Sequence, residues 1–153
     1  YATATGDQLG RGPLPPEVGE KTTYWVFFHV GGTINDLTDV AIEGTLGNNI
    51  TFTGRQSTSQ NSGVEYDPET GVISWTTSLL EPTLAPTSKV VGSAFELALT
   101  PDATMIGTTP TLLKDIRLTA IDSRTGAFVS ASGATVTTNL PDDLMAADKS
   151  VVE

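Results

Sequence analysis

Apolar and polar residues alternate along most of this chain with a period of two, as they do in half-buried β-strands. In the clearest run, residues 21–30, one face carries Tyr24, Val26, Phe28 and Val30. The opposite face carries Trp25, Phe27 and His29. Because both faces hold bulky side chains, we predict a central strand covered on both sides, or a strand whose outer face is met by a neighbouring element.

The same alternation recurs between turns rich in glycine, proline and asparagine. It predicts further strands at 1–5, 37–46, 50–54, 63–66, 72–77, 89–101, 115–121, 127–132 and 134–138. Residues 55–63 and 79–88 have no period and are predicted to be surface loops, and 102–113 to be irregular. No run keeps a helical period. This profile is typical of an all-β fold, a two-sheet antiparallel sandwich of about eight or nine strands without a substantial helix.

The five residues DPETG at 67–71 recur, with two changes, as DSRTG at 122–126. In each copy the aspartate can accept hydrogen bonds from backbone N–H groups two or three residues on, and the final glycine can adopt a positive φ. A calcium site needs several converging oxygen ligands, whereas DSRTG offers one acid beside an arginine. We therefore interpret both copies as hairpin turns.

The chain of 153 residues has the length of one domain. Prolines at 13, 15 and 16 divide it, so we predict an N-terminal strand and Gly/Pro linker at 1–16 and the sandwich at 17–140. Residues 141–153, PDDLMAADKSVVE, are predicted to be a C-terminal tail or linker with at most one helical turn.

The chain is acidic, with a net charge of −10 and only 8 basic residues. This balance disfavours nucleic acid as a partner, because phosphate contacts need clustered lysine and arginine. No stretch approaches the roughly 20 apolar residues that cross a bilayer, so we predict no membrane insertion within this chain. There are no cysteines, which excludes disulfides and thiolate metal sites.

Several motifs follow one another in a fixed order: GRGPLPPEVGEKTTYWVFFHV, NDLTDVAIEGTL, EYDPETGVISW, FELALTP, LTAIDSRTG and TTNLPDD. In this order they resemble the immunoglobulin-like repeat modules of prokaryotic cell-wall, S-layer-like and stalk proteins, conserved repeat domains of unknown function. The resemblance covers most of residues 10–143, and the chain departs from it at 44–50 and 79–88. It implies an immunoglobulin-like sandwich, a cell-surface location and a mechanical role, and it transfers no catalytic residue.

Candidate chemistry is sparse. His29 is the only histidine, and its place between Phe28 and Val30 is more typical of a packed or edge-exposed ring than of a catalytic one. The carboxylates at Glu43 and Glu96 are expected to point outward from strands. A cation site is conceivable only if the two ends of the sandwich bring together Asp36, Asp39, Asp142 and Asp143. A solvated acidic surface explains these residues better, and we predict no catalytic, cofactor-binding or metal-binding residue.

Two covalent modifications remain open. Lys21 opens an early strand and Asn139 closes the last one, so they could form an isopeptide crosslink, although exposed strand ends are the usual place for both residue types. Asn49-Ile50-Thr51 is an acceptor sequence for glycan attachment, placed on a predicted turn.

These observations favour a non-catalytic structural module, exported to the cell surface, that joins like subunits or tandem copies into a filament, stalk or layer. The strand at 1–5 is separated from the core by the Gly/Pro linker, so it can complete its own sheet or add to the next subunit. The candidate subunit contacts are Tyr1, Thr3, Thr5, Trp25 and Phe27. The alternative for the two aromatics is packing in the monomer core. The alternative function is an adhesin-type binding module for carbohydrate or protein, using the loops at 55–63 and 79–88.

Overall fold

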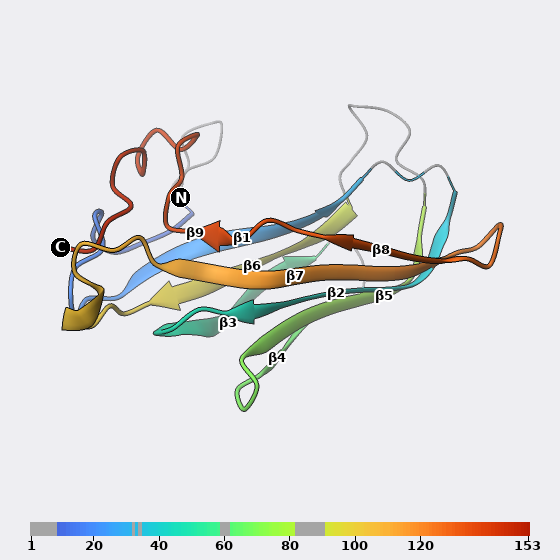
Figure 1. The fold of residues 1–153 in the computed structure, drawn as a ribbon, viewed down its shortest axis with the longest axis horizontal. Helices are drawn as coiled ribbons and strands as arrows, with labels where there is room; N and C mark the ends of the chain where they lie inside the picture. The colour runs from blue at the N-terminus through green and yellow to red at the C-terminus, as the bar shows by residue number, and fades with distance from the viewer. Residues whose placement is uncertain (1–8, 32, 34, 59–61, 82–90) are drawn as a thin grey trace.

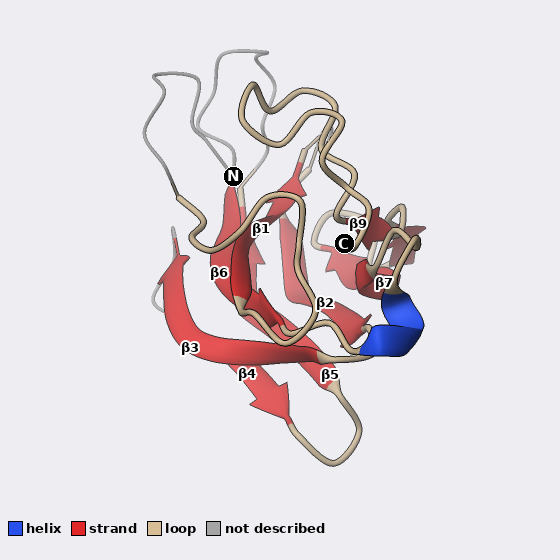
Figure 2. Ribbon diagram, turned by 90° about the vertical axis from the view of Figure 1, so that its left-hand side faces the viewer, coloured by secondary structure: helices blue, strands red, loops and turns tan. Residues whose placement is uncertain are grey.

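A computed structural model describes residues 9–31, 33, 35–58, 62–81 and 91–153 of the chain, so the strand predicted at 1–5 lies outside the described residues. The described part contains two antiparallel sheets that face each other (Figures 1 and 2). Its one helical element is the three-residue 3-10 turn η1 (Ala103–Met105). The predicted fold class, an all-β two-sheet antiparallel sandwich without a substantial helix, is confirmed for these residues.

The smaller sheet has the order β1-β6-β3 and the larger one the order β4-β5-β2-β7-β8, with β9 also paired to β7. The three strands of the smaller sheet are β1 (Thr22–Val30), β6 (Val91–Leu99) and β3 (Ile50–Thr58). The strands of the larger sheet are β4 (Val64–Asp67), β5 (Val72–Leu80), β2 (Leu37–Leu46), β7 (Thr111–Asp122), β8 (Phe128–Ser132) and β9 (Val136–Thr137).

The core forms between the sheets because the apolar positions of each strand alternate towards the other sheet. Its largest fully buried side chains include Trp75, Tyr24, Phe95, Ile73 and Leu97. Phe28 and Phe95 meet edge to face with ring centroids 5.0 Å apart, which joins the neighbouring strands β1 and β6 beneath the sheet. At one point these strands approach so closely that a Cβ atom on Gly92 would lie 1.7 Å from the carbonyl oxygen of Phe28.

Both repeated motifs are hairpin turns, as predicted. In DPETG the Asp67 carboxylate accepts hydrogen bonds from the Glu69 N–H at 2.9 Å and the Thr70 hydroxyl at 2.8 Å. In DSRTG the Asp122 carboxylate accepts from two backbone N–H groups, at 2.9 and 3.0 Å, and from the amide of Asn35 at 2.9 Å. The closing glycines have φ of 71° and 70°, in the region that glycine occupies without strain.

These hydrogen bonds also set the acidity of the two aspartates. The hydroxyl of Thr70, followed by the Glu69 N–H, lowers the pKa of Asp67 below its ordinary value. The amide of Asn35, followed by the Thr125 N–H, lowers the pKa of Asp122 in the same direction. The pKa of Asp67 is therefore lowered by its own turn, and the pKa of Asp122 by Asn35 together with its turn.

Several sequence expectations are corrected by the structure. The strand at 22–30 is the edge of its sheet rather than a central strand. Residues 55–58, predicted to be loop, belong to β3, because a register shift between Phe52 and Gln56, with Gly54 at φ 85°, hides the alternation. Residues 111–113, predicted to be irregular, begin β7, whose alternation is broken by Asp115 at φ 53°.

Residues 141–153, expected to be a tail or linker, pack against one end of the sandwich. Ala146 and Val152 are each only 1% exposed, and the Val152 N–H donates to the Thr108 carbonyl oxygen at 3.0 Å. The Glu153 N–H donates to the Pro16 carbonyl oxygen at 2.9 Å, which ties this segment to the approach to β1. Alternation could not reveal this packing, because the segment forms turns rather than a strand.

Candidate functional site: the open side of the sandwich

The side of the sandwich between β1 and β8 is open. β1 pairs only with β6, β8 pairs only with β7, and no strand among the described residues lies between these two edges. Figure 1 shows β8 and β9 running alongside β1. In the part of the chain that the structure describes, no backbone hydrogen bond joins β1 to β8, so the two sheets end here as separate edges.

The free edge of β1 presents a row of backbone hydrogen-bonding groups. The Thr23 N–H points away from β6, because it donates to the Arg11 carbonyl oxygen at 2.7 Å. In an antiparallel ladder every second residue shares this direction, so Trp25, Phe27 and His29 also turn their N–H and C=O groups outward. Within the described part of the chain, no backbone partner meets these three residues on that side. Unpaired edges of this kind are templates for another strand.

A cleft runs along the open side between the two edges. It has two adjoining parts, of about 330 and 350 Å³, which share Val30, Gly31, Leu118 and Ala131. The first part is also lined by Ile42, Ile116 and Val136, and the second by Thr33, Asn35 and Val129. The floor is thus largely aliphatic.

The floor is apolar but incompletely covered. Ile116, Leu118 and Val136 pack against the core and are only half-buried. The backbone at Gly133 lies close against Ile116, since a Cβ atom there would lie 2.8 Å from the Cγ2 of Ile116. The hydroxyl oxygen of Thr33 is buried and has no hydrogen-bond partner among the described residues. An aliphatic floor beside an unpaired strand edge suits an extended peptide better than a polar small molecule.

The chain itself covers the first part of the free edge. The Arg11 N–H donates to the Thr23 hydroxyl at 3.0 Å, and the Thr22 hydroxyl donates to the Pro13 carbonyl oxygen at 2.9 Å. Because the later residue of this segment meets the earlier residue of β1, the segment runs antiparallel to β1. Among the described residues of this segment, no hydrogen bond to Trp25 or to the residues after it is found.

Both predicted aromatic contacts lie on the outward face of β1, beside the free edge. Phe27 is 48% exposed and its ring lies 5.7 Å from that of His29. Trp25 is half-buried beneath the guanidinium of Arg55, whose Cζ is 5.7 Å from the ring centroid. The Trp25 indole N–H is buried and finds no hydrogen-bond partner in the described part of the chain. Neither ring is part of the monomer core.

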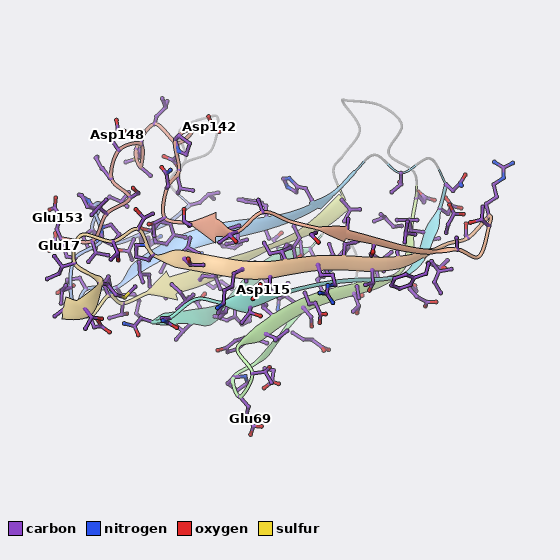
Figure 3. The ribbon with its side chains drawn as sticks, viewed as in Figure 1. Glu17, Glu69, Asp115, Asp142, Asp148 and Glu153 are labelled. Carbon is purple, nitrogen blue, oxygen red and sulfur yellow. The ribbon has the colours of Figure 1, made fainter. Side chains whose placement is uncertain are left out.

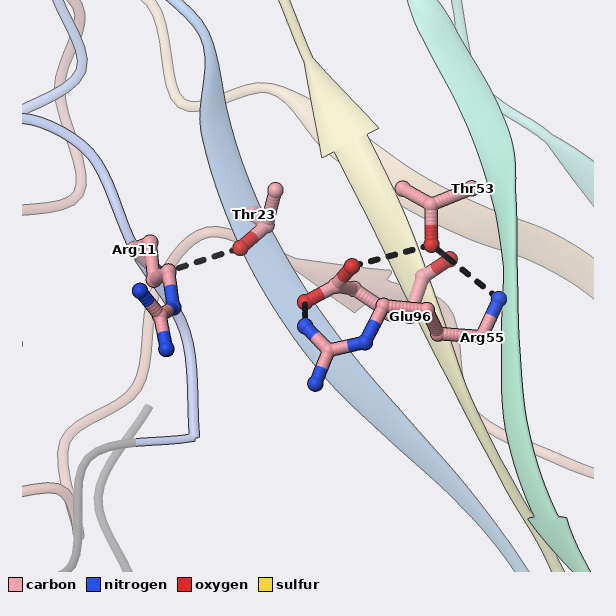
Figure 4. A network of polar contacts seen from close by, with 5 residues as sticks. All are labelled: Arg11, Thr23, Thr53, Arg55 and Glu96. Atoms are coloured by element: carbon pink, nitrogen blue, oxygen red, sulfur yellow. Dashed lines mark hydrogen bonds and ion pairs between the residues drawn. The ribbon is translucent and has the colours of Figure 1, made fainter.

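A buried carboxylate, that of Glu96, lies on this face, and Figure 4 shows it together with Thr53 and Arg55. Glu96, expected to point into solvent, is only 3% exposed and pairs across the sheet with Trp25. Its carboxylate accepts from the Arg55 guanidinium at 3.0 Å and from the Thr53 hydroxyl at 2.9 Å. Both partners come from the irregular part of β3, where the register shift interrupts the alternation of the sequence. This irregular part therefore compensates the buried charge of Glu96.

The remaining sequence candidates are not brought together. The backbone carbonyl oxygen of Asp36 accepts from the Ser123 N–H at the tip of the β7–β8 hairpin, whereas the Asp143 carboxylate caps a turn near the other end of β7. Asp142 is labelled at that second end in Figure 3, with Glu17, Asp148 and Glu153. No group of three histidine or acidic residues among those described could hold a metal ion. The side chains of Lys21 and Asn139 are exposed.

Of the two predicted aromatic contacts on β1, Phe27 lines the first part of the cleft and Trp25 does not. Trp25 and Phe27 were identified because they share the less usual face of a strongly alternating strand. Ile116, Leu118 and Ala131 were missed, since their strands look like ordinary half-buried strands, and only the pairing order shows that β8 is an edge. Tyr1, Thr3 and Thr5 lie outside the described residues.

Comparison with known protein families, with curated proteins and with solved structures gives no significant match for this chain. No helix in the described ranges is long and apolar enough to cross a membrane.

Proposed function

We propose that this protein is a non-catalytic structural module that joins like subunits into an extracellular filament, stalk or layer by adding a β-strand at the open side. The observation that carries the proposal is the cleft between β1 and β8, where an unpaired strand edge borders an aliphatic floor. This combination is what an added strand needs: ladder groups for its backbone and apolar positions for alternate side chains.

The physical gain from such an addition has two parts. Each ladder hydrogen bond to the outward groups of Trp25, Phe27 and His29 contributes about 0.5–1.5 kcal/mol net. Covering the half-buried floor contributes about 25 cal/mol for each Å² of apolar surface removed from water. A contact between the end of one copy and the side of the next is head to tail, so it extends into an open chain rather than closing as a dimer.

The location in this proposal comes from the resemblance to prokaryotic cell-surface modules. An acidic chain without cysteines fits that setting. Glycan attachment is part of the proposal at Asn49, which is exposed in a turn at φ 60°. Its amide donates to the Asp102 carboxylate at 2.8 Å and to the Met105 sulfur at 3.4 Å, so a sugar linkage would replace one of these two contacts.

The decisive experiment removes one backbone donor from the free edge. Phe27→Pro deletes an outward N–H without removing a β6 hydrogen bond, and proline is tolerated on edge strands in this orientation. We expect the full chain to form filaments or layers in electron micrographs at concentrations where Phe27→Pro remains monomeric. Phe27→Ala is the matched control, because it removes the ring and keeps the N–H.

Circular dichroism establishes that both variants keep the sandwich before assembly is compared. Dispersed monomers of the wild-type chain across the soluble concentration range would refute the proposal. Assembly of Phe27→Pro at the wild-type concentration would exclude the edge of β1 as the joint.

A further inference from the structure

We infer that the occupant of the cleft is residues 1–5, YATAT, of a second copy of this chain, running antiparallel to β1 with Tyr1, Thr3 and Thr5 facing the floor. This inference rests on the proposed function and deepens it, since it identifies the donated strand, its direction and its register. Two alternatives have to be excluded: a strand from another part of a neighbouring copy, and the same residues folding back onto their own subunit.

The direction follows from the chain's own contact with β1. The segment at Arg11–Pro13 runs antiparallel to the strand, with Arg11 opposite Thr23. A strand that continues along the same edge in the same direction joins the existing ladder groups without a reversal. Five extended residues span about 17 Å, which is the distance along β1 from Trp25 to Val30.

The register argues against occupation by the chain's own N-terminus. If the segment continued upstream from Arg11 in the register set at Thr23, the positions opposite the inward-facing residues of β1 would be Ala4, Gly6 and Gln8. Those positions would offer the aliphatic floor two very small side chains and one polar amide. A cleft with two parts of about 330 and 350 Å³ would remain poorly filled.

A second copy has no such constraint, because its own Arg11 is held at its own Thr23. The connecting residues GDQLG contain two glycines and extend up to about 17 Å between the two subunits. A shift of one residue relative to the fold-back register reverses which side chains face the floor. The ring of Tyr1 and the methyl groups of Thr3 and Thr5 then cover Ile116 and Leu118, and the tyrosine and threonines favour an extended conformation.

A mixing experiment distinguishes donation between copies from fold-back. The variant Phe27→Pro keeps the donor segment and lacks the acceptor edge, while a chain lacking residues 1–5 keeps the acceptor edge and lacks the donor. We expect each to be monomeric alone and the mixture to form a one-to-one complex by analytical ultracentrifugation, with a change in fluorescence from Trp25. Absence of a complex would overturn the inference, and Trp25→Phe in the acceptor chain identifies the fluorescence signal.

A second pair of variants tests the register in the full chain. We expect Thr3→Lys to weaken association by about tenfold or more, because it places a charge on the aliphatic floor, whereas Ala4→Lys, facing outward, changes it by less than about twofold. The opposite ranking would overturn the assigned register.

The outcomes also separate this inference from the proposed function. If the chain lacking residues 1–5 assembles like the wild type while Phe27→Pro does not, another strand fills the cleft, and the inference fails while the function stands. If the wild-type chain never assembles, both fail.

Discussion

The two lateral sides of the sandwich are built from similar strands, yet one is closed and the other is open. On the closed side, the edges β3 and β4 are joined by the side chain of Gln56, whose amide accepts from the Val64 N–H and donates to the Val64 carbonyl oxygen. The rings of Phe52 and Tyr66 cover the same side, edge to face with centroids 6.0 Å apart. On the side between β1 and β8, no described residue makes such a bridge.

The difference shows what closes a sandwich whose outer strands cannot pair. One primary amide has a donor and an acceptor in the arrangement of a peptide group, so a glutamine can satisfy the edge of a facing strand. The open side carries glycines at 31 and 133 and aliphatic side chains instead, which cannot satisfy a backbone. Among the described residues, the edges on one side are thus bridged within the monomer, and those on the other side are not.

The largest expected effect comes from removing a buried side chain on the closed side and comparing it with a counterpart on the open side. Trp75 is fully buried beside Val64 on the closed side, and its indole N–H donates to the Ser62 carbonyl oxygen at 3.0 Å. We expect Trp75→Ala to lower the free energy of unfolding by about 3–5 kcal/mol at every protein concentration, measured by urea denaturation.

Leu118→Ala is the counterpart on the open side. Because Leu118 is only half-buried, we expect a loss of about 1–2 kcal/mol in the monomer, together with a clear loss of assembly. Equal costs for the two substitutions in the monomer would mean that the open side is closed in solution.

A smaller effect tests the amide bridge itself. Gln56→Ala leaves the Val64 N–H and C=O without their partner, and we expect the free energy of unfolding to fall by about 1–3 kcal/mol. Ser57→Ala, at an exposed neighbouring position of β3, is the control and should be nearly neutral. We also expect Gln56→Ala to leave a second strand edge free to pair with another chain, which would be visible as lateral clustering of filaments in electron micrographs. Unchanged stability would show that the bridge contributes nothing.

The two hairpins provide the next comparison, since the β4–β5 hairpin forms a wall of the closed side and the β7–β8 hairpin a wall of the open side. Gly71→Ala and Gly126→Ala each force a Cβ atom into a positive φ, at a cost of about 1–2 kcal/mol. We expect similar losses of stability in thermal unfolding, with weakened assembly only for Gly126→Ala. Weakened assembly in both variants would argue against a joint confined to the β8 side.

The smallest effect is a dependence on pH. Because the folded-state pKa values of Asp67 and Asp122 are lowered, each group stabilises the fold above its unfolded pKa of about 4. That stability is lost as the pH falls through the lowered folded-state pKa. We expect the melting temperature to decline below about pH 4, and carboxyl NMR titrations of both aspartates to show midpoints below the ordinary value. An ordinary midpoint at Asp67 would contradict the hydrogen bonds of its turn.

The sequence predicted the strands and turns well where one residue in two faces the core. The inward set on β1 and both repeated turns were found, because alternation and turn chemistry are local properties. The extension of β3 through Thr58 was missed, because the register shift between Phe52 and Gln56 breaks the alternation. This irregular stretch supplies the side chain that pairs with Glu96. Half of the cleft was also missed, because an edge is defined by which strands pair, and pairing between distant segments leaves no local mark.

The carboxylate of Glu96 has a mechanical consequence if a neighbour pulls on β1. A load applied along that edge passes to β6 as shear across the nine residues of β1, and then from β6 to β3. Between β6 and β3 the load crosses the register shift, where few backbone hydrogen bonds connect the two strands. The ion pair from Glu96 to Arg55 and the hydrogen bond from the Thr53 hydroxyl link β6 to β3 where this ladder is interrupted, so they would share a load at that point.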